Sequence, residues 1–346
     1  MPSIDSTTPQ SIAELEDNLS TPTPDVIDVL QRLDGDIVVL GAGGKMGPTL
    51  ARMARRASDA AGSKRRVIGV SRFNSAGARQ ALEDSGVETI ACDLLDQESV
   101  QRLPDAPLVI CMTGLKFGSA DNPALTWAMN CYLPALISQR YRTSRIAVFS
   151  SGNVYGLVAH DSGGSVESDA TNPIGEYAIT VLGRERMFEY FSQKLEIPVV
   201  SLRLNYATEL RYGVLVDLAT QVWQEQTIDV SMGYVNVIWQ TEANAAALAA
   251  LAHAATPANV MNIAGLETLA IREVCQQIAR LMNKPLRLTG ETSSDAFLSN
   301  ATKSHELVGR PSVSAETMIR WTADWVARGG ESLGKPTHFE TTDGKY

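Results

Sequence analysis

Short apolar runs alternate with longer amphipathic segments along the first two hundred residues. The apolar runs have strand length and lie at 36–40, 66–70, 88–92, 108–112, 145–149 and 199–202. The segments between them repeat with helical periodicity and lie at 47–60, 75–84, 97–103, 123–141 and 176–193. Apolar runs without polar alternation are typical of strands that are buried on both faces. The alternation therefore predicts an α/β fold with a doubly wound parallel sheet and right-handed crossovers.

The pattern loosens after residue 202. Residues 203–242 mix short apolar runs with turns, and the rest of the chain predicts helices at 243–255, 271–283 and 315–326 and one strand at 259–263. We therefore predict four parts. They are an N-terminal extension with one helix at 1–34, the main α/β domain at 35–202, a smaller substrate-facing region at 203–330 that interleaves with the last sheet strands, and a polar tail at 331–346.

The two ends of the chain are polar. Residues 1–22 are rich in Ser, Thr and Pro and are expected to form a loose arm, with a helix beginning near Thr23. The tail is expected either to be disordered or to cover a partner.

Composition and charge narrow the class of protein. The 346 residues are 44% hydrophobic and 20% charged, which is enough to bury a substantial core. A net charge of −9 disfavours nucleic-acid binding. The longest apolar run, 243–255, is too short to span a bilayer, and residues 1–22 do not resemble a signal peptide. The four His and four Cys residues lack metal-ligand spacing. We expect a cytoplasmic protein with no metal and no membrane partner.

A glycine-rich loop directly follows the first predicted strand and opens a helix. Its glycines are Gly41, Gly44 and Gly47, with Lys45 and Met46 between the last two. A side chain at the glycine positions would keep the backbone away from a pyrophosphate, and the helix N-terminus offers free N–H groups to phosphate. The loop therefore predicts a dinucleotide-binding Rossmann domain. The alternative is a tight strand–helix turn without a ligand.

The end of the second strand bears on the choice of cofactor. Ser71 and Arg72 stand where an acidic residue would bind the ribose hydroxyls of NAD. An arginine there suits the 2′-phosphate, so NADP is favoured and NAD stays possible. The alternative for Arg72 is a solvated loop cation. Asp93 after the third strand, near the adenine, and Thr113 after the fourth complete the expected cofactor site.

Several motifs spread along the chain match one known family. They are the loop at 41–47, ACDLLD at 91–96, Asn130, VFSSGNVYG at 148–156, Tyr177, Glu185, RLNYA at 203–207, VMNIAG at 260–265 and ELVGRPSVSAETMIRWTADWV at 306–326. Together they resemble the extended short-chain dehydrogenase/reductase family, specifically its NAD-dependent epimerase/dehydratase branch. The resemblance runs from about residue 35 to 328.

This resemblance implies an NAD(P)-dependent enzyme that acts on nucleotide sugars or related polyols. It implies that Ser151 hydrogen-bonds the substrate oxygen, that Tyr177 is the general acid/base, and that Asn130 belongs to the helix packed under the active site and to the cofactor site. It also implies a homodimer formed through the helices at 123–141 and 176–193.

One residue of the family pattern is missing. A phenol with a pKa near 10 is a poor base at neutral pH unless its phenolate is stabilised, and the family uses a lysine four residues after the tyrosine. Here that position is Val181. Arg184 lies on the same helix face but roughly 10 Å further along the axis, and Lys116 lies in the loop after the fourth strand.

Three functional hypotheses follow. The first is an NAD(P)-dependent oxidoreductase or epimerase that transfers hydride at a carbinol carbon of a sugar or sugar derivative. The second is a cofactor-binding protein of the same fold without redox activity. The third is an enzyme of the family whose acid/base groups have moved to Lys116 or Arg184.

Overall fold

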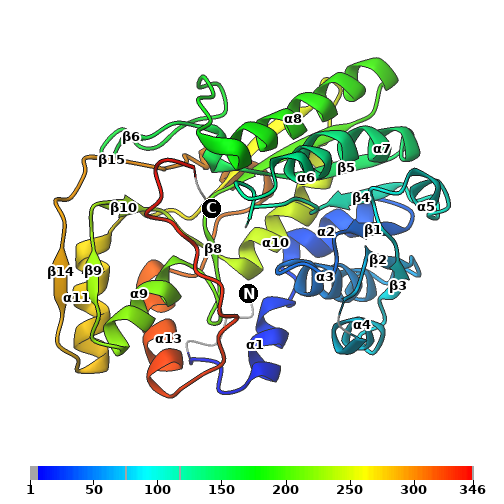
Figure 1. Cartoon of the computed structure of the whole chain (residues 1–346). Coiled ribbons are helices and arrows are strands. Elements are labelled where there is room, and N and C mark those ends of the chain that lie inside the picture. The colour runs from blue at the N-terminus through cyan, green and yellow to red at the C-terminus, as the bar shows by residue number, and fades with distance from the viewer. Residues whose placement is uncertain (1–6, 75, 117, 345–346) are drawn as a thin grey trace.

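The computed structural model describes residues 7–74, 76–116 and 118–344. Its centre is a seven-stranded sheet in the order β12-β7-β5-β4-β1-β2-β3, in which every neighbouring pair is parallel (Figure 1). The strands are β1 (Ile37–Leu40), β2 (Val67–Ser71), β3 (Glu88–Ala91), β4 (Leu108–Cys111), β5 (Arg145–Ser151), β7 (Val199–Leu204) and β12 (Asn259–Ile263). The predicted doubly wound parallel sheet is confirmed.

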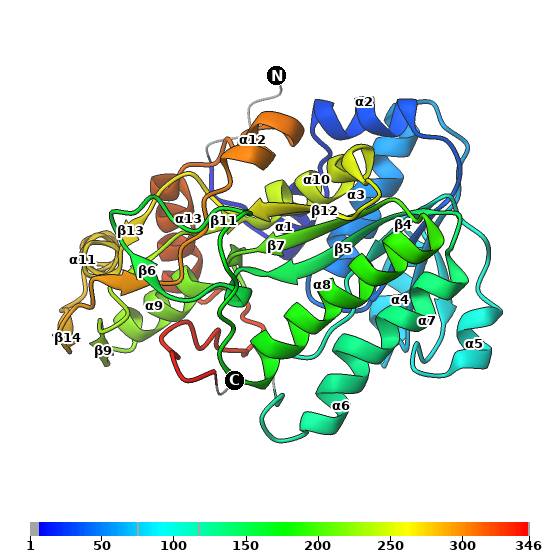
Figure 2. The same cartoon turned by 90° about the horizontal axis from the view of Figure 1, so that it is seen from above.

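Helices cover both faces of this sheet (Figure 2). One face carries α2 (Pro24–Arg32), α3 (Gly47–Ala60) and α10 (Gln240–Ala249), and α4 (Ala76–Glu83) lies beside α3. The other face carries α5 (Gln97–Gln101), α7 (Leu133–Arg140) and α8 (Gly175–Leu195). The helix predicted at 123–141 is a continuous run of α6 (Pro123–Trp127), a π-helical turn (Ala128–Tyr132) and α7.

Strand β1 explains why the apolar runs are continuous. Ile37 and Val39 point into the core under α2, α3 and α10, whereas Val38 and Leu40 point into the core under α5, α7 and α8. All four residues are fully buried. Because all strands run in the same direction, the loops after β1, β4 and β5 meet at one edge of the sheet.

The C-terminal region has a core of its own. Helices α9 (Val214–Trp223), α11 (Ile271–Met282) and α13 (Ala315–Ala327) pack together, and Trp239 contacts Trp321 edge to face. Short strands complete this part: β6 (Val158–Ala159), β8 (Ala207–Thr208), β9 (Thr227–Asp229), β10 (Tyr234–Val235), β11 (Ile238–Trp239), β13 (Leu269–Ala270), β14 (Arg287–Thr289) and β15 (Asp295–Ala296).

The structure adds two helices that the sequence pattern did not predict in this region: α9, within residues 203–242, and a second helix just before α13. Helix α12 (Thr302–Val308) precedes α13, where only one helix was expected. It has seven residues and no side-chain cap, so it carries too little periodic signal to be predicted.

Among the described residues, no helix is long and apolar enough to cross a membrane.

The N-terminal extension contains two helices rather than one. Helix α1 (Ile12–Leu19) begins at Ser11, whose side chain accepts a hydrogen bond from the Glu14 N–H. Leu15 and Leu19 are fully buried in the C-terminal core. The prediction of a loose arm is therefore wrong for the described part of 1–22, because two leucines one helical turn apart anchor an otherwise polar segment.

Residues 330–344, which we call the C-terminal strap, lie across the molecule next to the N-terminal end of α8 (Figure 1). Thr337 donates hydrogen bonds from its N–H and Oγ1 to Asp217 Oδ2, at 2.8 and 2.6 Å. Phe339 is buried in the C-terminal core. The prediction of a disordered tail is therefore wrong for the described residues, because Thr337 and Phe339 fix the strap to the protein itself.

Candidate active site

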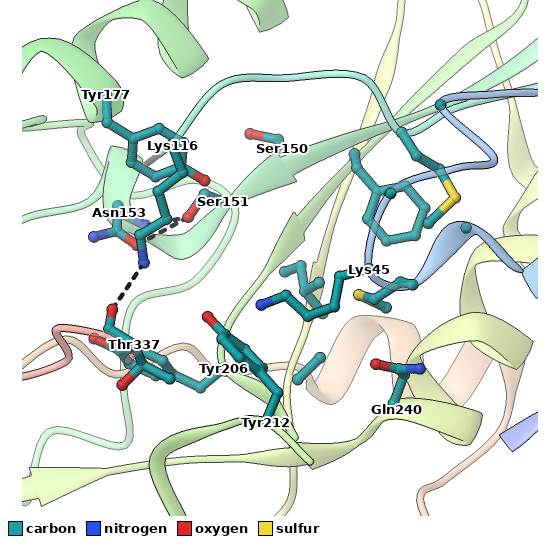
Figure 3. Close-up of a pocket in the computed structure, with 18 of the residues that line it drawn as sticks. Lys45, Lys116, Ser150, Ser151, Asn153, Tyr177, Tyr206, Tyr212, Gln240 and Thr337 are labelled. Atoms are coloured by element: carbon teal, nitrogen blue, oxygen red, sulfur yellow. Dashed lines mark hydrogen bonds between the residues drawn. The ribbon is translucent and has the colours of Figure 1, made fainter. Parts of the chain in front are cut away.

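A cavity of about 270 Å³ lies at the carboxyl edge of the sheet, between the main domain and the C-terminal region. Its wall combines the loop after β1, the ends of β4 and β5, the first turn of α8, residues 204–214 and the strap residue Thr337. Figure 3 shows Ser151, Tyr177, Lys45 and Lys116 around this space.

The glycine-rich loop forms the wall on the β1 side. Gly41 has φ +92, and a Cβ on Gly47 would lie 2.6 Å from the Gly41 carbonyl oxygen, so neither position accepts a side chain without strain. Met46 precedes α3 and forms no side-chain cap hydrogen bond with its first turn. The N–H groups of that turn are therefore open to a ligand. These features fit the phosphates of a dinucleotide.

The residues expected near the adenosine lie at the neighbouring strand ends, outside the cavity wall. Ser71 ends β2 and packs on Gly43. Arg72 is exposed and forms no hydrogen bond or ion pair with any residue that the structure describes. Asp93 accepts a 3.0 Å hydrogen bond from the Leu95 N–H. Thr113 is buried and packs against Gly41 of the glycine-rich loop.

Ser151 and Tyr177 form a hydrogen-bonded pair in the cavity wall. Burial raises the pKa of the Tyr177 phenol, while the hydrogen bond to Ser151 and the positive charge of Arg184 act in the opposite direction. Ser151 is itself held by Asn153, because its Oγ donates to Asn153 Oδ1 at 2.9 Å. The hydroxyl pair predicted from the sequence is thus brought together.

The position of the missing lysine is filled by packing. Val181 is fully buried and contacts Val154 and Tyr155. It contributes nothing to the cavity wall, so the charge near Tyr177 has another source.

Arg184 supplies that charge from beneath the site. Its Nη1 donates to the Phe149 carbonyl at 2.7 Å, and its Nη2 donates to Asn130 Oδ1. Asn130 also donates to Thr180 Oγ1 at 2.9 Å and holds both polar backbone groups of Leu115. Asn130 therefore braces the loop that carries Lys116 and does not itself line the cavity.

Two lysines reach the cavity. Lys116 Nζ lies 5.7 Å from the centroid of the Tyr177 ring and donates to the Thr337 carbonyl at 3.4 Å. Burial lowers the pKa of Lys116 to about 8. Lys45 Nζ lies over the ring of Tyr212, and burial together with the charge of Lys116 lowers the pKa of Lys45 to about 6.

Sequence reasoning missed several residues of the cavity wall. Tyr212, Gln240 and Thr337 come from segments with no recognisable motif, and only the tertiary fold brings them to the site. Tyr206 lies within the RLNYA motif, and this motif was the one available signal for it.

A buried ion pair stands behind the site. Arg203 Nη2 and Glu185 Oε2 are 2.8 Å apart, with each side chain 5% exposed. Ser150 Oγ also donates to Glu185 Oε1, and Arg203 Nη1 donates to Tyr155 Oη at 2.7 Å. The Arg203–Glu185 ion pair thus links α8 to β7, and the hydrogen bond from Ser150 links it to β5 next to Ser151.

Comparison with known proteins agrees with this architecture. The model of the NAD dependent epimerase/dehydratase family matches residues 37–207. Over these residues the chain is similar to this family, in line with the resemblance to the extended short-chain dehydrogenase/reductases seen in the sequence. A search of curated proteins finds no match.

Solved structures with the same fold cover 85% of this chain. UDP-glucuronic acid 4-epimerase from Bacillus cereus, in complex with NAD, has a TM-score of 0.70 and 18% identity, with 99% of its own chain covered. dTDP-glucose 4,6-dehydratase from Bacillus anthracis, in complex with NAD, has a TM-score of 0.71 and 14% identity, with 97% covered. UDP-glucose 4-epimerase from Thermotoga maritima, with UDP-glucose, has a TM-score of 0.68 and 15% identity, with 99% covered.

Proposed function

We propose that the protein is an NAD(P)-dependent oxidoreductase or epimerase that acts on a sugar or sugar derivative by hydride transfer at a carbinol carbon. One observation carries this proposal. The hydrogen-bonded Ser151–Tyr177 pair and the phosphate-binding type of loop face the same cavity. The similar structures from Bacillus cereus and Bacillus anthracis, which are complexes with NAD, support the choice of cofactor class.

The chain's own residues supply binding and proton transfer. A bound nicotinamide would supply the hydride acceptor or donor. Gly41, Gly44 and Gly47 let its phosphates approach the backbone, and the first turn of α3 binds them. Ser151 donates to or accepts from the substrate oxygen, and Tyr177 takes or returns the hydroxyl proton. Arg184 supplies part of the electrostatic role of the missing lysine, because its charge favours the phenolate form of Tyr177 and offsets some of the rise in pKa that burial causes.

Binding and turnover measurements test this function. Purified protein is titrated with NADPH and NADH while nicotinamide fluorescence is followed, and is then assayed with a panel of sugars and polyols. Failure to bind either cofactor would overturn the proposal. Tight binding without turnover of any panel member would favour the alternative of a cofactor-binding protein without redox activity.

Arg72 is proposed to select NADP. Its exposed guanidinium stands at the end of β2 without a partner among the described residues, in the place where a 2′-phosphate would lie. We expect Arg72→Ala to weaken NADPH binding by roughly tenfold or more, because a charge-assisted contact is lost, and to leave NADH binding nearly unchanged. Arg102→Ala, at an exposed arginine that directly follows α5, is the control. An equal loss for both cofactors would contradict this assignment.

A homodimer is proposed through the outer face of α6, the π-helical turn and α8. This face exposes a group of large apolar side chains: Leu125, Trp127, Tyr132, Ile179 and Tyr190, each between 40% and 51% exposed. Grouped apolar exposure of this kind marks association surfaces.

If this face forms the dimer interface, a charge introduced on it should prevent dimer formation. Ile179→Arg is expected to convert the protein to monomers, because it places an unpaired charge in the interface. Leu281→Arg, at a similarly exposed leucine on α11, should leave the molecular mass of the dimer in solution unchanged. Light scattering coupled to size exclusion measures both, and a monomeric wild type would refute the dimer.

A further inference from the structure

Cationic side chains from two different loops meet in the cavity. Lys45 comes from the loop after β1 and Lys116 from the loop after β4, and both extend into the same space (Figure 3). They are close enough for the charge of Lys116 to lower the pKa of Lys45, and Lys335 of the strap adds to this effect. The hydroxyls of Ser151 and Tyr177 face the same space.

The acidic groups near these lysines are held by other residues. Asp217 accepts two hydrogen bonds from Thr337, and Glu209 pairs with Arg211 at 3.0 Å. Together with Glu340 they raise the pKa values of the lysines, but burial and the positive charges outweigh them. A negatively charged group placed between the two lysines would offset the cost of burying their charged forms, so this part of the cavity favours an anionic ligand.

The C-terminal strap and the volume of the cavity limit the size of that ligand. Thr337 forms part of the wall, and the strap runs from Asp217 on α9 to the first turn of α8, where Gly344 contacts Gly175. The space enclosed is about 270 Å³, and part of it adjoins the phosphate loop. Pockets for drug-sized ligands span about 300–1,000 Å³, so the part of this cavity away from the phosphate loop suits a ligand of the size of a single sugar unit.

We propose that the substrate is a small sugar derivative that carries a carboxylate and no nucleotide, with its carboxylate between Lys116 and Lys45. The proposal rests on the proposed function and names the substrate class of the same site. A hydroxyl of the substrate then lies at Ser151 and Tyr177 while the two lysines hold the carboxylate. Lys116 thereby acts as a substrate anchor. Lys45 is also part of the phosphate loop. Its substitution therefore tests whether this side chain binds the carboxylate of the substrate or the phosphates of the dinucleotide.

Calorimetric titration of the full chain tests the proposal, with and without saturating NADPH. The probes are D-glucuronate, D-galacturonate and D-gluconate, their neutral counterparts D-glucose and D-galactose, and UDP-glucuronate. At least one free acid is expected to bind about tenfold or more tightly than its neutral counterpart and than UDP-glucuronate. At pH 7 acid binding should also take up protons, since Lys45, with its pKa near 6, gains charge beside a carboxylate. Proton uptake is read from titrations in buffers of different ionisation enthalpy.

Substitutions of the two lysines test whether they bind the carboxylate. Lys116→Met is expected to weaken acid binding about ten- to a hundredfold, with NADPH affinity retained and, in turnover, with KM raised more than kcat is lowered. Lys45→Met should weaken acid binding and abolish the proton uptake. Lys64→Met, at an exposed loop lysine, is the matched control.

Several results would overturn the proposal. They are failure of every free acid to bind, binding of neutral sugars or UDP-glucuronate as tight as that of the acids, and a Lys45→Met effect confined to NADPH. A Lys116→Met variant that lowers kcat and shifts its pH profile with KM unchanged would make Lys116 catalytic instead. Failure of NADPH and NADH to bind is a separate result that contradicts the proposed function and not the carboxylate site.

Discussion

Replacing Tyr177 with phenylalanine is expected to lower kcat by about 10²- to 10⁴-fold, the range that a positioned general acid or base contributes. The substitution removes one oxygen atom, the one that pairs with Ser151, and keeps the ring in the cavity wall. Binding of the nicotinamide cofactor should be unchanged, because the phosphate loop and α3 are not touched. The measurement is steady-state turnover together with fluorescence titration of NADPH.

The pH dependence of the wild type provides a second readout. Burial raises the pKa of Tyr177, so the proton-accepting phenolate is gained only as the pH rises and the proton-donating phenol persists through the neutral range. Oxidation of the substrate hydroxyl should therefore accelerate toward alkaline pH, and this rise should disappear in Tyr177→Phe. Tyr190→Phe, at an exposed tyrosine on the same helix, is the control and should keep full turnover. Retention of wild-type kcat by Tyr177→Phe would remove Tyr177 from the mechanism.

The main sheet could be predicted because its strands carry the signal themselves. Ile37 to Leu40 are apolar at every position since each faces a core, and the same holds for Leu108 to Cys111. The unpredicted parts depend on tertiary contacts. Helix α1 is stabilised by Leu15 and Leu19 and by Glu16, which pairs with both Arg52 and Arg211. No local pattern shows these partners.

The candidate site divides in the same way. The glycine loop, Ser151 and Tyr177 follow from motifs because each is fixed by the strand or helix that carries it. The effect of Arg184 on Tyr177 could not be predicted from the sequence. Spacing along the helix axis does not show the path of the arginine side chain, which passes close to Gly114. Thr337 contacts Lys116 across 221 sequence positions, and only the folded strap brings them together.

Removing the Glu185 carboxylate is expected to destabilise the protein by about 3–5 kcal/mol, the typical cost of leaving one partner of a buried ion pair uncompensated. In Glu185→Ala, the Arg203 guanidinium keeps its charge in a site where it is 5% exposed, and Ser150 loses its acceptor. The free energy of unfolding is measured by urea denaturation.

Two comparisons separate this effect from a general response of α8 to mutation. Glu189→Ala breaks an ion pair with Arg186 on the same helix, where the two side chains are 42% and 59% exposed, so the loss should stay below about 1 kcal/mol. The double variant Glu185→Leu/Arg203→Met removes both charges and should recover much of the stability, because the desolvation cost disappears with them. Equal losses in Glu185→Ala and Glu189→Ala would show that the Glu185–Arg203 pair is hydrated in solution. Ser151 would then lack the rigid support that the buried pair gives to the end of β5.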